Sequence, residues 1–379
     1  MQSKTLMTLL LVGATACQTM AGNDTIDPSL ERADLAPLFD CQTLDSGLYW
    51  VGLDNDMEIH VPGVTNAYYE PDAPTVIFVH GWQNGVTERG ERESLRYRFR
   101  DNNDDIDIDT ADAWVESGWN VGVFYWTQFA DEREVKDAEA KIWSSSGRRG
   151  MRWRLCDGSY TETVMPAGGA GELFYDAYTA AMSDYRGNDV RIVGHSLGNQ
   201  MAVRLAHQVK TAIDAGTLPS NLLPNRVALL DPFWSKGSKD YLGGQWTGAV
   251  IRDLVGDLLD DGVVFERYKN SNINDFAIGD RNDSLSDRIG ETELIPGWIS
   301  RFNQAARHTV STYLYFHGFA HAPPAGCRTV DGEYRCDLPG PSAATSDAEL
   351  RELMDGAFRF IQSEGQNTNR LDDDVLRER

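Results

Sequence analysis

The sequence has no long hydrophobic run and few basic residues for its size. Its strongest apolar run, residues 6–12, is far shorter than the roughly 18 residues that a membrane-spanning helix needs. The 379 residues include 35 Lys and Arg against 58 Asp and Glu, which gives a net charge of −23. Such a surface repels phosphate backbones, so no nucleic-acid partner is expected. With 41% hydrophobic and 25% charged residues, the composition excludes a disordered, collagen-like or coiled-coil chain.

The first residues are typical of a targeting segment. Lys4 gives a positive start, residues 6–12 (LMTLLLV) an apolar stretch, and residues 14–16 (ATA) a small-residue exit before Cys17. This order resembles a bacterial lipoprotein signal, although Ala14 stands where that family usually has Leu. The resemblance implies removal of residues 1–16, lipidation of Cys17, and an outer-membrane location because Gln18 follows the cysteine. Ordinary secretory cleavage near the same position is the alternative.

Cysteine is scarce, and no CxxC spacing or Cys/His cluster suggests zinc, so no metal is expected. If Cys17 carries lipid, four cysteines remain, and they allow three pairings. Cys327 and Cys336 flank the turn pair Asp331-Gly332. We predict that they close a hairpin, and that Cys41 and Cys156 close a long loop in an oxidising compartment.

Strongly apolar runs alternate with amphipathic segments along the chain. Near-continuous β-branched and aromatic runs are typical of strands buried on both faces of a parallel sheet. After two short candidate strands at 48–51 and 58–61, such runs occupy residues 75–79, 120–126, 190–193, 226–230 and 263–267. Amphipathic segments at 169–184, 197–214 and 247–260 lie between them or follow them. The alternation predicts a doubly wound, mostly parallel α/β sheet with helices on both faces. We expect a tether at 17–45, one catalytic domain at 46–361 and a frayed polar tail at 362–379.

The pentapeptide at 194–198 (GHSLG) is a G-x-S-x-G motif placed directly between a predicted strand and a predicted helix. That context is required by the nucleophile elbow of α/β-hydrolases, in which small residues flank a strained turn and the serine projects above the sheet. A glycine-rich turn with an incidental serine is the alternative. The motif predicts Ser196 as a nucleophile.

The same fold places the acid and then the base after the serine. Of the seven histidines, His308 is the best candidate base, because it opens the segment HTVSTYLYF after a polar loop. His317 and His321 lie deeper in or beyond that segment and are predicted to be structural. Asp231, at the end of the run RVALL, is the predicted acid, and Asp275 is its rival.

The ordered motifs resemble the pancreatic-type lipase group of α/β-hydrolases. Residues 230–232 (LDP) match its acid context, HTVSTYLYF matches the Ser and aromatics after its histidine, and residues 120–126 end in Trp as its corresponding strand does. The similarity spans about residues 75–319. It implies an ester attacked by Ser196, an acyl-enzyme, no cofactor, and an oxyanion hole made by the backbone N–H groups of Trp82 and Leu197.

Two features differ from that group. About 60 residues follow Phe319, too few for the C-terminal β-sandwich of the pancreatic enzymes, and no cysteine between 156 and 327 could close a lid. The stretch 271–307 is either a cap or a packed surface excursion, and the apolar face of the cap would comprise Ile295, Trp298, Ile299 and Phe302. Aromatic residues flanking the rim loops either line an acyl pocket or fill the core: Trp82, Trp126, Phe233 and Trp234.

The aspartate-rich stretch 101–112 partly matches a calcium loop. Asp105, Asp107, Asp109 and Glu116 occupy loop positions 1, 3, 5 and 12. Position 6 requires glycine and holds Thr110, and residues 110–118 fit a helix, so the helix is favoured over a calcium site.

These inferences predict an exported serine esterase or lipase acting on a small-molecule or lipid ester. It would be held at the membrane by a lipidated N-terminus, or else be periplasmic or secreted. The same residues could cleave amides or thioesters or transfer acyl groups, because the acyl-enzyme is common to all. A non-catalytic surface binding protein of the same fold is the remaining alternative. The sequence does not indicate the oligomeric state.

Overall fold

The computed structural model describes residues 30–31, 39–101, 104–275, 278–356, 359–369 and 372–379. The predicted signal peptide, Cys17 and most of the predicted tether lie outside these residues. No helix within the described part of the chain is long and apolar enough to cross a membrane.

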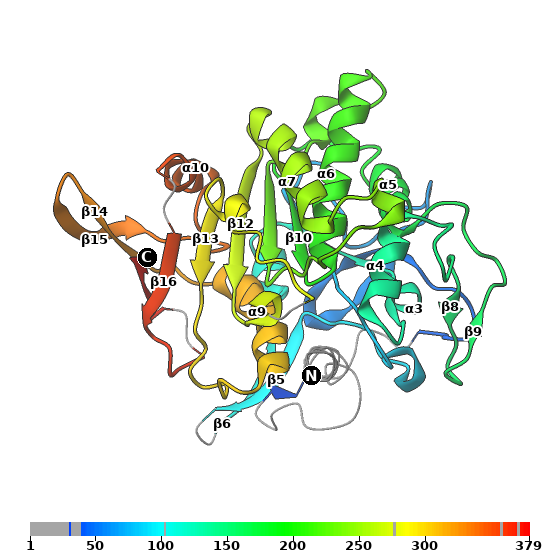
Figure 1. Cartoon of the computed structure of the whole chain (residues 1–379), viewed down its shortest axis with the longest axis horizontal. Coiled ribbons are helices and arrows are strands. Elements are labelled where there is room, and N and C mark those ends of the chain that lie inside the picture. The colour runs from blue at the N-terminus through cyan, green and yellow to red at the C-terminus, as the bar shows by residue number, and fades with distance from the viewer. Residues whose placement is uncertain (1–29, 32–38, 102–103, 276–277, 357–358, 370–371) are drawn as a thin grey trace, which may run out of the picture.

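A large twisted sheet runs through the centre of the molecule (Figure 1). Its strand order is β15-β14-β17-β16-β13-β12-β11-β10-β4-β7-β2-β3, and neighbouring strands from β16 through β7 are parallel. The parallel strands are β4 (Thr75–Val79), β7 (Asn120–Tyr125), β10 (Val190–His195), β11 (Arg226–Leu230), β12 (Val264–Lys269), β13 (Gly290–Glu293) and β16 (Arg359–Glu364). All five apolar runs are therefore strands, and the predicted α/β-hydrolase type of sheet is confirmed.

Additional strands extend this sheet or form small sheets of their own. Antiparallel β2 (Gly47–Val51) and β3 (Met57–Ile59) complete one edge. At the other edge lie β14 (Ala325–Val330), β15 (Glu333–Pro339) and β17 (Val375–Glu378). The separate strands are β1 (Leu30–Glu31), β5 (Arg96–Asp101), β6 (Asp104–Asp109), β8 (Trp153–Arg154) and β9 (Tyr160–Thr161).

Helices cover both faces of the sheet because alternate residues of each parallel strand point to opposite sides. Ile77, Val79 and Ile192 belong to one buried cluster, whereas Val76, Phe78 and Val193 belong to another. The first cluster is covered by α4 (Val135–Trp143), α5 (Ala170–Ala181), α6 (Gly198–Asp214) and α7 (Thr247–Asp260). The second is covered by α2 (Asp112–Glu116) and α9 (Gln304–Gly318). The described residues also form the short helices α3 (Thr127–Ala130) and α8 (Asp283–Ser286) and the helix α10 (Asp347–Asp355).

The prediction of a frayed tail at 362–379 is wrong for residues 362–364 and 375–378, which form strands. Residues 362–364 belong to β16, and β17 pairs with both β14 and β16. Phe360 and Leu376 are almost completely buried and pack with Val264 and two leucines of α10. These apolar contacts hold an otherwise polar segment in the sheet.

The stretch 271–307 is not a separate cap. It contains β13, which pairs with β12 and β16 inside the main sheet. Ile299 is fully buried, whereas Phe302 is 81% exposed, so the four aromatic and aliphatic residues assigned to one cap face do not share one environment.

The aspartate-rich stretch forms the β5–β6 hairpin and α2 instead of a calcium loop. Asp107 accepts hydrogen bonds from Arg96 and Arg98, which lower its pKa to about 2. The inward side chains Tyr97 and Phe99 pack against Tyr313 of α9, in a small cluster that also contains Ile299, Ala306, Val310 and Leu314. The hairpin thus supports the helix that carries His308.

Both predicted disulfides are present, Cys41–Cys156 and Cys327–Cys336. The sequence separations of the two pairs are 115 and 9 residues. Because a cross-link restricts the unfolded chain more when its loop is longer, replacing Cys41 and Cys156 by serine is expected to lower the free energy of unfolding by about 4–5 kcal/mol. The same change at Cys327 and Cys336 is expected to cost about 2–3 kcal/mol. Guanidinium unfolding of the two double variants checks this order, and an equal or larger loss at the short loop would contradict it.

Candidate active site

Ser196 occupies a strained turn between β10 and α6. Its φ is +56°, in the left-handed region, as a nucleophile elbow requires. A Cβ at Gly198 would lie 2.1 Å from the carbonyl oxygen of Val79, and one at Gly194 would lie 2.6 Å from the Cα of Asn199. Only glycine fits at both flanking positions, which explains the motif physically. The serine is therefore held at the positive end of α6.

Asp231 and His308 are joined directly across the carboxyl end of the sheet. His308 Nδ1 lies 2.5 Å from Asp231 Oδ2, and both side chains are buried. Burial alone would raise the pKa of Asp231, but hydrogen bonds from His308, Ser271 and Asn270 outweigh it and hold that pKa below its ordinary value. The carboxylate is therefore ionised and can keep His308 Nδ1 protonated.

The imidazole of His308 lies at the elbow. Its ring centroid is 4.5 Å from that of His195, the residue before Ser196. His195 Nε2 also donates to the backbone carbonyl of His308 at 3.0 Å. With Nδ1 facing Asp231, His308 Nε2 is buried and has no hydrogen-bond partner among the described residues. The structure thus joins His308 to Asp231, and it places the imidazole against His195, the residue that precedes Ser196.

The rival candidates lie in other interactions. The Asp275 carboxylate is 3.6 Å from Lys269 Nζ and 3.4 Å from Arg281 Nε. His317 and His321 face each other with their Nε2 atoms 3.2 Å apart. Burial, with a smaller effect of His321, lowers the pKa of His317 to about 4.

The loop after β4 passes directly against the elbow. A Cβ at Gly81 would lie 2.6 Å from the Cβ of Ser196 and 3.1 Å from the backbone nitrogen of Leu197. Within the part of the chain that the structure describes, neither Trp82 N–H nor Leu197 N–H donates to another group. Both donors are therefore available for an anionic oxygen next to Ser196.

Two acidic residues that sequence reasoning missed hold this loop in place. Asp131 accepts from the backbone N–H groups of Gly85 and Thr87 at 2.7 and 2.9 Å. Trp82 Nε1 donates to the backbone carbonyl of Glu132 at 2.5 Å. The only sign of this role in the sequence was the position of the two residues shortly after β7, the strand that pairs with β4.

The acyl-pocket interpretation of three aromatic residues is not supported. Trp126, Phe233 and Trp234 are at most 1% exposed and belong to the main hydrophobic core. Trp126 Nε1 instead donates to the backbone carbonyl of His80 at 2.8 Å. Large aromatic side chains at strand ends serve here as core filler, and Trp82 alone of the four is partly exposed.

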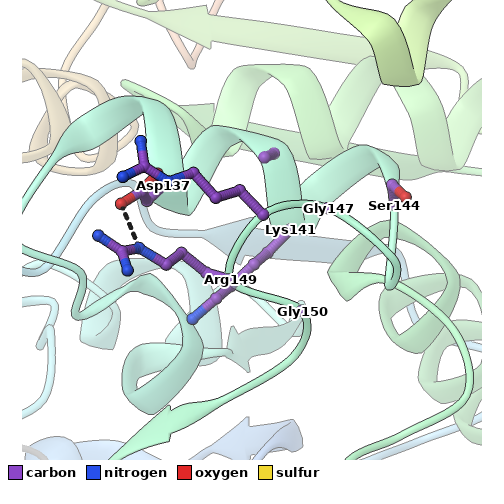
Figure 2. A pocket seen from close by; sticks show the side chains of 8 residues that line it. Asp137, Lys141, Ser144, Gly147, Arg149 and Gly150 are labelled. Atoms are coloured by element: carbon purple, nitrogen blue, oxygen red, sulfur yellow. Dashed lines mark hydrogen bonds and ion pairs between the residues drawn. The ribbon is translucent and has the colours of Figure 1, made fainter.

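A small polar hollow lies apart from these residues, beside the end of α4 (Figure 2). Arg149 Nε donates to Asp137 Oδ2 at 2.9 Å across it. Neither Ser196, Asp231 nor His308 is among the residues that line it. Nor does the described part of the chain place three or more His, Cys, Asp or Glu side chains where they could hold a metal ion.

No protein-family model matches the chain, and no curated protein matches it. Among solved structures, it is similar to a probable hydrolytic enzyme from Pseudomonas aeruginosa, with 15% identity, a TM-score of 0.21, and coverage of 45% of this chain and 38% of that one. A poly(3-hydroxybutyrate) depolymerase from Bordetella parapertussis is 13% identical, with a TM-score of 0.29 and coverage of 65% and 69%. Esterase B from Lactobacillus rhamnosis is 13% identical, with a TM-score of 0.22 and coverage of 72% and 75%. The chain therefore spans well under half of the first of these structures, and similarities this low do not identify its activity.

Proposed function

We propose that the chain is an exported serine hydrolase that cleaves carboxylic esters. The observation that supports this most is the His308 imidazole, held by an ionised Asp231 and lying beside the strained turn of Ser196. The Nε2 atom of His308 has no hydrogen-bond partner among the described residues, and this is the nitrogen that a general base uses.

In this proposal Ser196 Oγ attacks the ester carbonyl while His308 Nε2 removes its proton. The new oxyanion accepts hydrogen bonds from the backbone N–H groups of Trp82 and Leu197. The imidazolium, stabilised by Asp231, returns the proton to the leaving alcohol and leaves an acyl-enzyme. Water, deprotonated by the same imidazole, then attacks the acyl carbon and releases the carboxylic acid and free Ser196.

A fluorophosphonate probe tests this proposal on the whole chain, because the probe reacts with an activated serine and needs no known substrate. Labelling of the folded protein, abolished by heat denaturation, supports a serine hydrolase. Failure of the folded protein to label would favour a non-catalytic binding protein of the same fold.

The type of bond that the chain cleaves is tested with a matched panel of esters, thioesters and amides that share one acyl group. We propose that the ester of a small molecule or lipid is hydrolysed fastest. A second panel of p-nitrophenyl esters with increasing chain length measures the acyl preference. Faster turnover of the thioester or the amide would show that the chain uses the same acyl-enzyme chemistry on that bond instead of on esters.

Export and anchoring are part of the proposal. The two disulfides support an oxidising compartment, and the residues before Cys17 support a lipidated N-terminus facing a membrane. In cells fed a labelled fatty acid, the wild-type chain is expected to take up label and Cys17→Ala to take up none. A wild-type chain without label that is still shortened would instead indicate ordinary secretory cleavage.

A further inference from the structure

We propose that Ser271 is a positioning residue that fixes the Asp231 carboxylate and limits how strongly it attracts the His308 proton. This inference rests on the function proposed above. It concerns a residue forty positions beyond Asp231, in the loop directly after β12, to which β11 is paired.

The two oxygens of Asp231 are held by different groups. Oδ1 accepts from the backbone N–H groups of Asn270 and Ser271 at 3.0 and 3.1 Å. Oδ2 accepts from the hydroxyl of Ser271 and also from His308 Nδ1. Ser271 therefore contacts both oxygens, and its hydroxyl shares one of them with the imidazole.

The Ser271 hydroxyl is oriented for this role. Its oxygen accepts from the backbone N–H of Ile273 at 3.3 Å, so its own hydrogen is directed toward Asp231. Ser271 is only 4% exposed, so water does not readily replace the hydroxyl. A buried hydrogen bond to an ionised carboxylate is stronger than one between neutral groups.

Sharing Oδ2 has a predictable electrostatic effect. A donor to a carboxylate oxygen withdraws negative charge from that oxygen, and this weakens the hydrogen bond that the oxygen accepts from a second donor. Without the Ser271 hydroxyl, Oδ2 would attract the His308 proton more strongly and would favour the imidazolium. Loss of the Asp231 charge itself would have the opposite effect.

The groups that face this pair remain unchanged when only Ser271 is altered. The imidazole of His308 faces Asp231 from β11 and His195 from β10. The carboxylate faces the backbone of residues 270–271 from the loop after β12. A change in the pH profile can therefore be assigned to the Ser271 hydroxyl.

The test compares wild type, Ser271→Ala, Ser271→Thr and Asp231→Asn in the pH profile of kcat/KM for a p-nitrophenyl ester. For Ser271→Ala we expect kcat to fall roughly tenfold with KM changed less than about twofold, because the hydroxyl is bonded to the Asp231 carboxylate. We also expect the acid limb to move up by roughly half a pH unit, and that of Asp231→Asn to move down. Ser271→Thr keeps the hydroxyl and is expected to restore the wild-type limb.

Ser286→Ala is the matched control. Ser286 is also a buried serine, and its hydroxyl oxygen accepts from Arg267 instead of contacting the Asp231–His308 pair. Its loss should lower thermal stability at most and leave the acid limb in place. If Ser271→Ala does not fold, Ser271→Cys replaces it, with a weaker donor of similar size and a limb expected to move in the same direction.

The outcomes separate the two proposals. If wild type neither labels with a fluorophosphonate nor turns over esters, the proposed function fails. If wild type is active but Ser271→Ala leaves kcat and the acid limb unchanged, the role of Ser271 is overturned while the function stands. A fall in kcat equal to that of Ser286→Ala, without a limb shift, would show that the hydroxyl is only structural and would also overturn it.

Discussion

Ser196→Ala is expected to lower kcat/KM for p-nitrophenyl esters by on the order of 10⁵-fold and to abolish fluorophosphonate labelling. The methyl group cannot attack a carbonyl, and the elbow offers no other hydroxyl at the same position. Some rate above that of the uncatalysed reaction should remain, because the backbone donors of Trp82 and Leu197 are unchanged.

The control for this change is Ser220→Ala, which removes an exposed serine hydroxyl. Both variants should keep the far-UV circular dichroism of wild type, and Ser220→Ala should keep full labelling. Retention of more than a tenth of wild-type turnover in Ser196→Ala would show that another residue is the nucleophile.

Asp231→Asn is expected to lower kcat by on the order of 10⁴-fold near neutral pH while leaving KM within a few-fold. The asparagine keeps the shape of the side chain but removes the charge that stabilises the imidazolium. Its amide can also donate toward Nδ1, which favours the tautomer with a protonated Nε2 that cannot act as a base. Steady-state kinetics across pH measure both effects.

Asp275→Asn separates the two candidate acids. The Asp275 carboxylate forms ion pairs with Lys269 and Arg281, whereas His308 is bonded to Asp231, so neutralisation of Asp275 should change kcat by less than about threefold. A larger loss at Asp275 than at Asp231 would reverse the assignment of the acid.

The central strands and the elbow could be predicted because their signals are local. A strand buried on both faces needs a continuous apolar run, and 75–79 and 226–230 match the observed strands residue by residue. The strained turn at Ser196 leaves room only for glycine at positions 194 and 198, two residues before and after the serine, so the motif directly reflects the geometry of the turn.

The parts that were predicted wrongly, left open or missed depend on contacts between distant residues. Residues 359–364 (RFIQSE) contain only two apolar residues, yet they form β16 between β13 and β17, and the packing of Phe360 with Leu376 and α10 fixes their position. Similarly, a tryptophan at a strand end can face either solvent or core, and only the helices packed over Trp126 and Trp234 decide this. The contact of Ser271 with Asp231 joins two loops forty residues apart, and no spacing in the sequence reveals it.

The support that the β5–β6 hairpin gives to α9 has a consequence for how the protein loses activity on heating. Val310 and Tyr313, on the same helix as His308, pack in a small cluster with Tyr97 and Phe99 that is distinct from the two large clusters of the sheet. A segment anchored by fewer apolar contacts opens at a lower free-energy cost than the core around it. Detachment of the hairpin would displace the base while the sheet stayed intact, so inactivation should precede global melting and should be reversible on cooling.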